Sequence, residues 1–196
     1  MELRPLIELL TQRLLLRPWC DADRALFAAL NADPMVMRYE PGTLTRKESD
    51  ARANQIEQVL QKLGGLGMFA IERPTTGEVL GFIVVIAVTF DADFAPATEI
   101  GWRLTPSAWG HGFATEAARA IAGSAFEALP LSELVAFTTA ANAPSRAVMR
   151  RLGMSHDPAE DFDHPLIPPL SPLRRHVLYR LTADDTHVAT PRGSRS

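Results

Sequence analysis

The chain has 196 residues, of which 46% are hydrophobic and 22% charged, and a formal net charge of −3. This composition is typical of a folded soluble protein, and the small net charge gives no general attraction to nucleic acid or to an anionic membrane. No apolar run is long enough to span a bilayer, and the first residues lack the apolar region of a signal peptide. The single cysteine, Cys20, excludes a disulfide framework within the chain. We therefore expect one cytoplasmic domain over residues 1–182, followed by a disordered polar tail over residues 183–196.

Hydrophobic periodicity and turn residues divide the chain into alternating strands and helices, which indicates the α/β class. The predicted strands lie at residues 12–18, 67–73, 79–88, 98–105 and 134–138, with a last one after residue 172. The predicted helices lie at about 21–30, 45–63, 118–129 and 142–152. Asp21 or Asp23 can cap the first helix, and a capping box of Thr45 and Glu48 opens the second. The segment 31–42, with its prolines and glycine, is predicted to be a loop.

The segment from Trp109 to Ala117, Trp-Gly-His-Gly-Phe-Ala-Thr-Glu-Ala, joins a predicted strand to a predicted helix. Such a turn directs free backbone N–H groups outward from the positive end of the helix dipole, which favours an anion such as phosphate. Gly110 and Gly112 permit positive φ and a close approach of the main chain to a ligand. The loop lacks the Gly-Lys-Ser/Thr of a Walker A motif, and Thr115 stands where a dinucleotide-binding loop has its third glycine. Taken alone, the loop is equally consistent with an ordinary glycine-rich turn.

A second motif follows the strand at 134–138. It reads as a short helix, with Pro144 in the first turn and a glycine at the end. Together the two motifs resemble the acetyl-coenzyme A signature of the GNAT superfamily of N-acetyltransferases, in the branch of the ribosomal-protein N-terminal acetyltransferases (RimJ/RimL-like). The residues that match the second motif of that branch are Asn142, Ser145, Met149, Gly153 and Met154. Trp109 departs from the Gln or Arg of the general family pattern, and Thr11–Arg17 resembles the first strand of the family.

The resemblance covers about residues 11–181 and implies a mixed, mostly antiparallel sheet of about seven strands with about four flanking helices. It implies that the strands at 98–105 and 134–139 splay apart and admit acetyl-coenzyme A into the gap. The strand backbone would then bind the pantetheine arm and the loop amides the pyrophosphate, with no metal required. The cofactor-binding residues implied in this way are Arg103, Leu104, Thr105, Gly110, His111, Gly112, Phe113, Ala114, Thr115, Asn142 and Ser145.

Acetyl transfer to an amine requires a base for the amine proton and an acid for the leaving thiolate. Glu99 is our first candidate for the base because it lies at the edge of the strand that leads into the cofactor loop; a solvated strand residue is the alternative. Ser145 is the candidate on the thiolate side, where the family often has a hydroxyl, although it could equally bond backbone in a first helical turn. The two tyrosines, Tyr39 and Tyr179, do not match the acid position of other branches. Glu116 is expected to favour the helix dipole.

The segment from His156 to Pro172 is long, acidic and stiffened by proline. The resemblance places it over the acceptor site, where His164 would be an alternative base. Four of its residues carry carboxylates: Asp157, Glu160, Asp161 and Asp163. These carboxylates would attract a cationic amine, in a salt-dependent way. A metal site formed with the histidines is less favoured because no compact motif such as His-Glu-x-x-His is present. A rigid surface loop is the remaining interpretation.

Two functions from different classes follow from the sequence. The first is an N-acetyltransferase that moves the acetyl group of acetyl-coenzyme A directly to a primary amine in a ternary complex, the acceptor being a protein N-terminus or a small molecule. The second is a non-catalytic coenzyme A-binding or sensing domain of the same fold, because the acid–base set is incomplete. A homodimer is compatible with either function.

Overall fold

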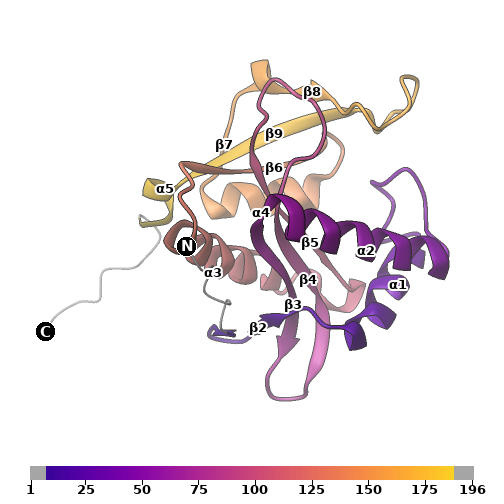
Figure 1. The fold of residues 1–196 in the computed structure, drawn as a ribbon, viewed down its shortest axis with the longest axis vertical. Coiled ribbons are helices and arrows are strands. Elements are labelled where there is room, and N and C mark those ends of the chain that lie inside the picture. Colours follow the sequence, from indigo (N-terminus) through magenta and orange to yellow (C-terminus); the bar gives the residue numbers. More distant parts are fainter. Residues whose placement is uncertain (1–7, 188–196) are drawn as a thin grey trace, which may run out of the picture.

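The structure, a computed structural model, describes residues 8–187. Nine strands form one sheet in the order β1-β2-β3-β4-β5-β6-β9-β7, and β8 also pairs with β9 (Figure 1). The strands are β1 (Leu9–Leu10), β2 (Leu15–Pro18), β3 (Gly65–Arg73), β4 (Glu78–Ala87), β5 (Thr98–Leu104), β6 (Glu133–Thr139), β7 (Ser155–His156), β8 (Phe162–Asp163) and β9 (Arg175–Thr182). The α-helices are α1 (Arg24–Ala32), α2 (Arg46–Leu63), α3 (Phe113–Ala128), α4 (Ala143–Leu152) and α5 (Ala183–His187). The predicted class is confirmed, and the short elements β1, β7, β8 and α5 are additional to it.

Neighbouring strands pair antiparallel except β5 and β6, which run parallel and share one register pair, Glu99 with Val135. Helix α3 supplies the crossover that a parallel pair needs. Beyond Glu99 the two strands no longer pair, so the sheet opens toward the ends of β5 and β6. This arrangement confirms the mostly antiparallel, splayed sheet.

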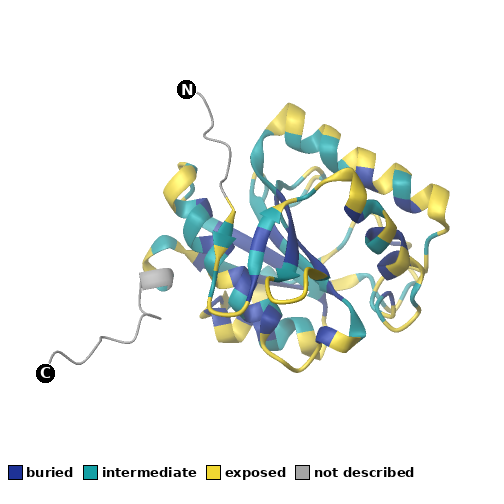
Figure 2. Ribbon diagram, turned by 90° about the horizontal axis from the view of Figure 1, so that it is seen from below, coloured by how far each residue is buried: buried dark blue, intermediate teal, exposed yellow. Residues whose placement is uncertain are grey.

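Helices cover both faces of the sheet, with buried residues turned inward (Figure 2). The larger core packs α3 and α4 against one face, which includes Ile100 and Leu104 of β5. A row of alanines on both sides of Ile121 lets α3 approach the sheet closely. The smaller core places Phe27 of α1 and Ala53 of α2 against the opposite face. Because side chains alternate along a strand, Glu99, Gly101 and Arg103 share this second face.

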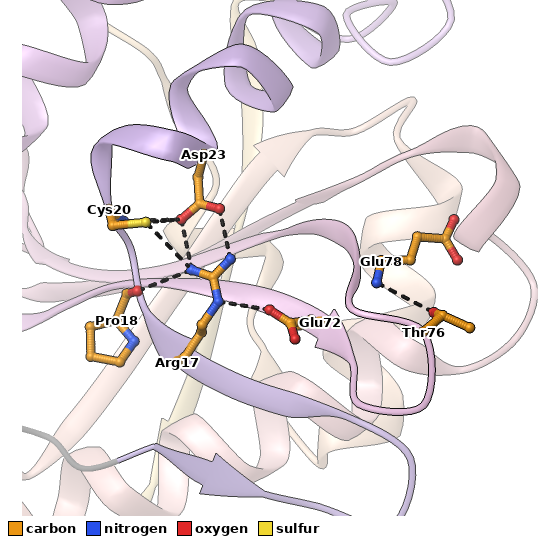
Figure 3. Close-up of polar contacts among 7 residues, drawn as sticks. All are labelled: Arg17, Pro18, Cys20, Asp23, Glu72, Thr76 and Glu78. Carbon is orange, nitrogen blue, oxygen red and sulfur yellow. Dashed lines mark hydrogen bonds and ion pairs between the residues drawn. The ribbon is translucent and has the colours of Figure 1, made fainter.

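Arg17 fixes the end of β2 to the start of the helical region (Figure 3). Its guanidinium donates two hydrogen bonds of 2.8 Å to the buried carboxylate of Asp23 and one of 2.7 Å to Glu72. Burial alone would raise the pKa of Asp23, but hydrogen bonds from Arg17 and Cys20 outweigh burial and lower it. Asp23 stands at the N-cap position of α1, but it makes no side-chain cap hydrogen bond to that helix; its carboxylate accepts the backbone N–H of Cys20 instead, at 3.0 Å.

Two other predictions from the sequence can be compared with the observed ends of helices. The capping box of α2 is confirmed: Thr45 accepts the N–H of Glu48, and Glu48 accepts the N–H of Thr45 at 2.8 Å. The predicted tail begins at Ala183, where the structure instead forms α5; residues 188–196 lie outside the described residues. No helix between residues 8 and 187 is both long and apolar enough to cross a bilayer.

Candidate active site

A cleft of about 1950 Å³ opens where β5 and β6 separate. Its walls are built by β4, β5, β6, the loop before α3, the first turns of α3 and α4, helix α2 and the chain after β8. Typical sites for one small ligand hold about 300–1,000 Å³. The cleft therefore has room for two substrates side by side.

The glycine loop presents six consecutive free amides to this cleft. No acceptor in the described part of the chain takes the N–H of any residue from 110 to 115. Gly112, the residue before α3, has a φ of 79°, which turns the chain sharply into the helix. Thr115, in the first turn, is buried and its hydroxyl has no hydrogen-bond partner among the described residues. Free amides at the positive end of a 16-residue helix fit a phosphate-bearing ligand.

The loop is held in place by a distant part of the chain. Glu116 accepts hydrogen bonds from Thr11 Oγ1 at 2.7 Å, from the main-chain N–H of Arg13 at 2.9 Å and from Arg13 Nε at 2.7 Å. Arg13 also donates to the carbonyl of His111 at 2.9 Å. Burial opposes ionisation of Glu116, but these hydrogen bonds prevail and lower its pKa. Glu116 thus anchors the loop to the segment before β2, which is more than the expected dipole effect.

The free edge of β5 carries its own binding groups. Thr105 donates its N–H to the carbonyl of Leu80 at 2.8 Å, so this amide is already used by the neighbouring strand. In an antiparallel ladder the main-chain N–H and C=O groups of successive residues point alternately to the two sides of the strand. Those of Arg103 therefore point to β4, as the N–H of Thr105 does, and those of Trp102 and Leu104 point into the gap. The Leu104 carbonyl accepts from Trp109 Nε1 at 2.9 Å. The main-chain donors of β5 open to a ligand are therefore those of Trp102 and Leu104. Of the three residues predicted on this strand, Leu104 directs its N–H to the gap, and Arg103 and Thr105 direct theirs to β4.

Glu99 stands at the base of the cleft, at the last paired position of β5 and β6. A Cβ added to Gly101 would lie 3.5 Å from Oε1 of Glu99, so the carboxylate reaches along β5 toward the cofactor loop. No described residue forms a hydrogen bond with this carboxylate. Burial raises its pKa to about 7; the charge of Glu40 also raises it and that of Arg52 lowers it. The side chain is enclosed by protein but keeps contact with the cleft, so it can exchange a proton near neutral pH.

The charged neighbours of Glu99 differ in how far they are neutralised. Glu40 forms an ion pair with Arg103 at 2.7 Å, and Arg103 also donates to the side-chain oxygen of Asn31. Arg52, on α2, lines the same cleft and has no hydrogen bond or ion pair within residues 8–187. Arg52 is therefore a cation of this cleft that no acidic side chain of the described residues pairs with. Sequence reasoning singled out neither Glu40 nor Arg52, because no local pattern marks them.

His164 lines the cleft, but two features disfavour it as the base. Burial lowers its pKa to about 4, helped by the charges of His176 and Arg52. Its Nδ1 accepts the N–H of Leu166 at 3.3 Å, so the proton of the neutral ring belongs on Nε2 and no lone pair remains for a substrate.

The acidic segment before His164 does not supply free carboxylates, in contrast to the expectation from sequence. Two of its carboxylates are bound within the segment: Asp157 accepts the N–H of Ala159, and Asp161 binds His156. The other two are bound by residues in or next to β9: Glu160 binds Arg180, and Asp163 lies against Arg174 and Arg175. None of the four lines the cleft. Between residues 8 and 187 no group of three or more potential ligands could hold a metal.

The remaining predicted residues divide into cleft and core. Ser145 lines the cleft, and its hydroxyl has no hydrogen-bond partner in the described chain. Asn142 caps α4 by accepting the N–H of Ser145 at 3.2 Å and donates to Thr138 at 2.9 Å, so it has a structural role beside any contact with a ligand. Tyr39 lines the cleft, whereas Tyr179 is buried in the core and stacks on a histidine.

A mixed sheet that splays beside an anion-binding helix N-terminus is the arrangement found in N-acetyltransferases. The family model for the acetyltransferase (GNAT) domain matches residues 13–155, and the chain belongs to this family. The resemblance seen in the sequence is thereby confirmed.

Individual proteins agree with this assignment. The chain is 32% identical over 157 residues to the FsC-acetyl coenzyme A-N(2)-transacetylase of Aspergillus fumigatus, covering 74% of this chain and 64% of that protein. A solved acetyltransferase from Agrobacterium tumefaciens is 30% identical, with a TM-score of 0.69 over 90% of this chain and 94% of the other. RimJ of Mycobacterium smegmatis, solved with a CoA disulfide, shares the fold at 23% identity, with a TM-score of 0.68 over 89% and 86% of the two chains.

Proposed function

We propose that this acetyltransferase moves the acetyl group of acetyl-coenzyme A directly to a primary amine, with Glu99 as the general base. The observation that carries the proposal is the position of Glu99. It is an unpaired carboxylate with a pKa near 7. It lies where β5 and β6 separate, in the same cleft as the free amides at the N-terminus of α3. The names of the relatives, an acetyl-coenzyme A-dependent transacetylase and a CoA-bound RimJ, support the choice of donor.

The residues of the cleft fit the two halves of coenzyme A. The amides of residues 110–115 would hold the pyrophosphate, and the N–H groups of Trp102 and Leu104 would hold the pantetheine arm or the thioester oxygen. The bound co-substrate supplies an activated acyl group, a thioester. The acceptor then occupies the part of the cleft beyond Glu99, toward α2 and the chain after β8.

Proton transfer follows from the pKa of Glu99. Above pH 7 more than half of this carboxyl group is ionised, and the carboxylate takes the proton of the amine as nitrogen bonds to the acyl carbon. The sulfur leaves as the carbon–sulfur bond breaks and must gain a proton. Among the hydroxyl groups that line the cleft, those of Ser145 and Tyr39 are our candidates for supplying this proton. Direct transfer is favoured because Cys20, the single cysteine, lies against Arg17 and Asp23 and outside the cleft.

Thiol release from acetyl-coenzyme A, measured with a panel of primary amines, tests the proposal. Turnover with intersecting initial-rate patterns is the expected result, because both substrates must be bound before transfer. Parallel patterns would indicate an acetyl-enzyme and contradict direct transfer. Tight binding of acetyl-coenzyme A without turnover of any amine would favour the alternative, a non-catalytic coenzyme A-binding domain.

A further inference from the structure

Six aromatic rings gather at the acceptor end of the cleft. They come from the loop between β4 and β5, from β6, and from β8, β9 and the chain between them: Phe90, Phe94, Phe137, Phe162, His164 and His176. None of the four phenylalanines belongs to either buried core, and each is only partly buried. An aromatic group of this size outside the core is suited to binding a ligand.

Four of these rings form one wall of the cleft. Phe90, Phe137, His164 and His176 all line it, with ring centroids 4.5 Å apart for Phe90 and His164 and 4.9 Å apart for the two histidines. Phe137 lies two residues beyond Val135, the register partner of Glu99, so it shares the sheet face of the carboxylate. The wall is therefore next to the proposed base.

The wall is uncharged at neutral pH. Burial lowers the pKa of both histidines below the usual value, that of His164 to about 4, so the neutral form of both rings is favoured at pH 7. An aromatic or bulky apolar group can bury its surface against these rings without removing a charge from water.

The charges around the wall disfavour a polycationic acceptor. Glu40 is paired with Arg103, and the four carboxylates of the acidic segment lie outside the cleft. Arg52 lines the cleft, has no hydrogen bond or ion pair among the described residues, and lies close enough to act on the ionisation of both Glu99 and His164. A guanidinium at such a place is suited to a carboxylate.

Resting on the acetyl transfer proposed above, we propose that the acceptor is a primary amine that carries both an aromatic group and a carboxylate, as an aromatic amino acid does. The amine would lie at Glu99, the ring against Phe90 and Phe137, and the carboxylate at Arg52. This assignment uses three features of the cleft that are independent of the cofactor loop.

The test compares acceptors that differ in one group each: L-phenylalanine, 2-phenylethylamine without the carboxylate, L-alanine without the ring, L-phenylalaninamide as the equivalent of a protein N-terminus, and spermidine as a polycation. We expect kcat/KM to be highest for L-phenylalanine. It should be about tenfold lower or more when either the ring or the carboxylate is missing.

Two variants connect this preference to the residues. Arg52→Gln should abolish most of the preference for L-phenylalanine over 2-phenylethylamine, and Phe90→Leu should reduce that for L-phenylalanine over L-alanine. Each preference is a ratio of two kcat/KM values measured on one variant. A change in the pKa of Glu99 acts on both amines alike and therefore cancels in the ratio. Arg46→Gln is the matched control, because Arg46 lies on the same helix, pairs with Asp50 at 2.9 Å and does not line the cleft.

The outcomes separate this inference from the function on which it rests. Turnover of spermidine, L-alanine or L-phenylalaninamide in preference to L-phenylalanine would overturn the inference and leave acetyl transfer intact. An unchanged preference in Arg52→Gln would remove Arg52 as the carboxylate contact and overturn the inference as stated. If no amine is acetylated, the proposed function fails and the inference fails with it.

Discussion

Replacing Glu99 by Gln removes the proposed base while keeping the size of the side chain. General base catalysis typically contributes about 10²–10⁴ in rate, so we expect kcat at pH 8 to fall by about 10²-fold, with little change in the dissociation constant of acetyl-coenzyme A. In the wild type, kcat should rise with pH through a midpoint near 7, where the carboxylate ionises. The variant should lose this midpoint. His164, with a pKa of about 4, cannot produce it.

The assay is thiol release with both substrates saturating, from pH 5.5 to 9, so that kcat reports only groups of the ternary complex. His164→Gln is the control and should keep the midpoint near 7. If the midpoint persists in Glu99→Gln, another group or the amine itself controls the rate, and Glu99 is not the base.

The same substitution should stabilise the protein at alkaline pH. The folded state raises the pKa of Glu99 from 4.5 to about 7, so the native state holds the proton more tightly and stability falls as pH rises through this window. A shift of that size corresponds to about 3 kcal/mol, and water in the cleft reduces the effect, so about 1–3 kcal/mol is expected above pH 8. Urea unfolding should show the variant more stable at pH 8 and unchanged at pH 4. A loss of stability at pH 8 would show that the carboxylate has a structural partner.

Three other predictions concern the glycine loop, its contact with Arg13, and the Arg17–Asp23 ion pair. Gly112→Asp should weaken acetyl-coenzyme A binding in calorimetry by about tenfold or more, because a carboxylate would enter the anion site; Gly77→Asp, at a φ of 68° in the β3–β4 hairpin, controls for backbone strain. Arg13→Gln should raise the KM for acetyl-coenzyme A but not for the amine, and equal rises would refute a specific role in the loop. Asp23→Asn should lower the free energy of unfolding by about 3 kcal/mol at pH 7, because it leaves Arg17 without its buried partner. By urea unfolding this difference should shrink below about pH 4, since the lowered pKa of Asp23 contributes stability only while the carboxylate is ionised; an equal difference at both pH values would contradict it.

The parts of the site that could be predicted from sequence are those that local structure determines. Gly110 and Gly112 mark a strand-to-helix turn, and such a turn leaves its amides free for a reason that involves only neighbouring residues. Glu99 could be proposed because its strand leads directly into that turn. The capping box of α2 was predictable for the same reason, since both partners lie within one helical turn.

The parts that were missed depend on residues far apart in the sequence. Glu116 is bound by Thr11 and Arg13 across more than a hundred residues, and no spacing rule relates them. The acidic segment was misinterpreted because its neutralising partners, such as Arg180, lie on the following strand. The aromatic wall was missed because its rings come from several separate segments of the chain. Composition shows that charges and rings are present, and only the fold shows which of them remain free.

The pKa of the base offers a last test, because two neighbours act on it in opposite directions. Glu40 raises the pKa of Glu99 and Arg52 lowers it, both less strongly than burial does. Glu40→Gln should therefore move the midpoint of the kcat profile below that of the wild type, and the freed guanidinium of Arg103 should act in the same direction. Arg52→Gln should move the midpoint above it. Opposite shifts, with similar plateau rates for an amine without a carboxylate, would identify Glu99 as the titrating group. Shifts of the same sign in both variants, or none in either, would contradict the charge arrangement described for this cleft.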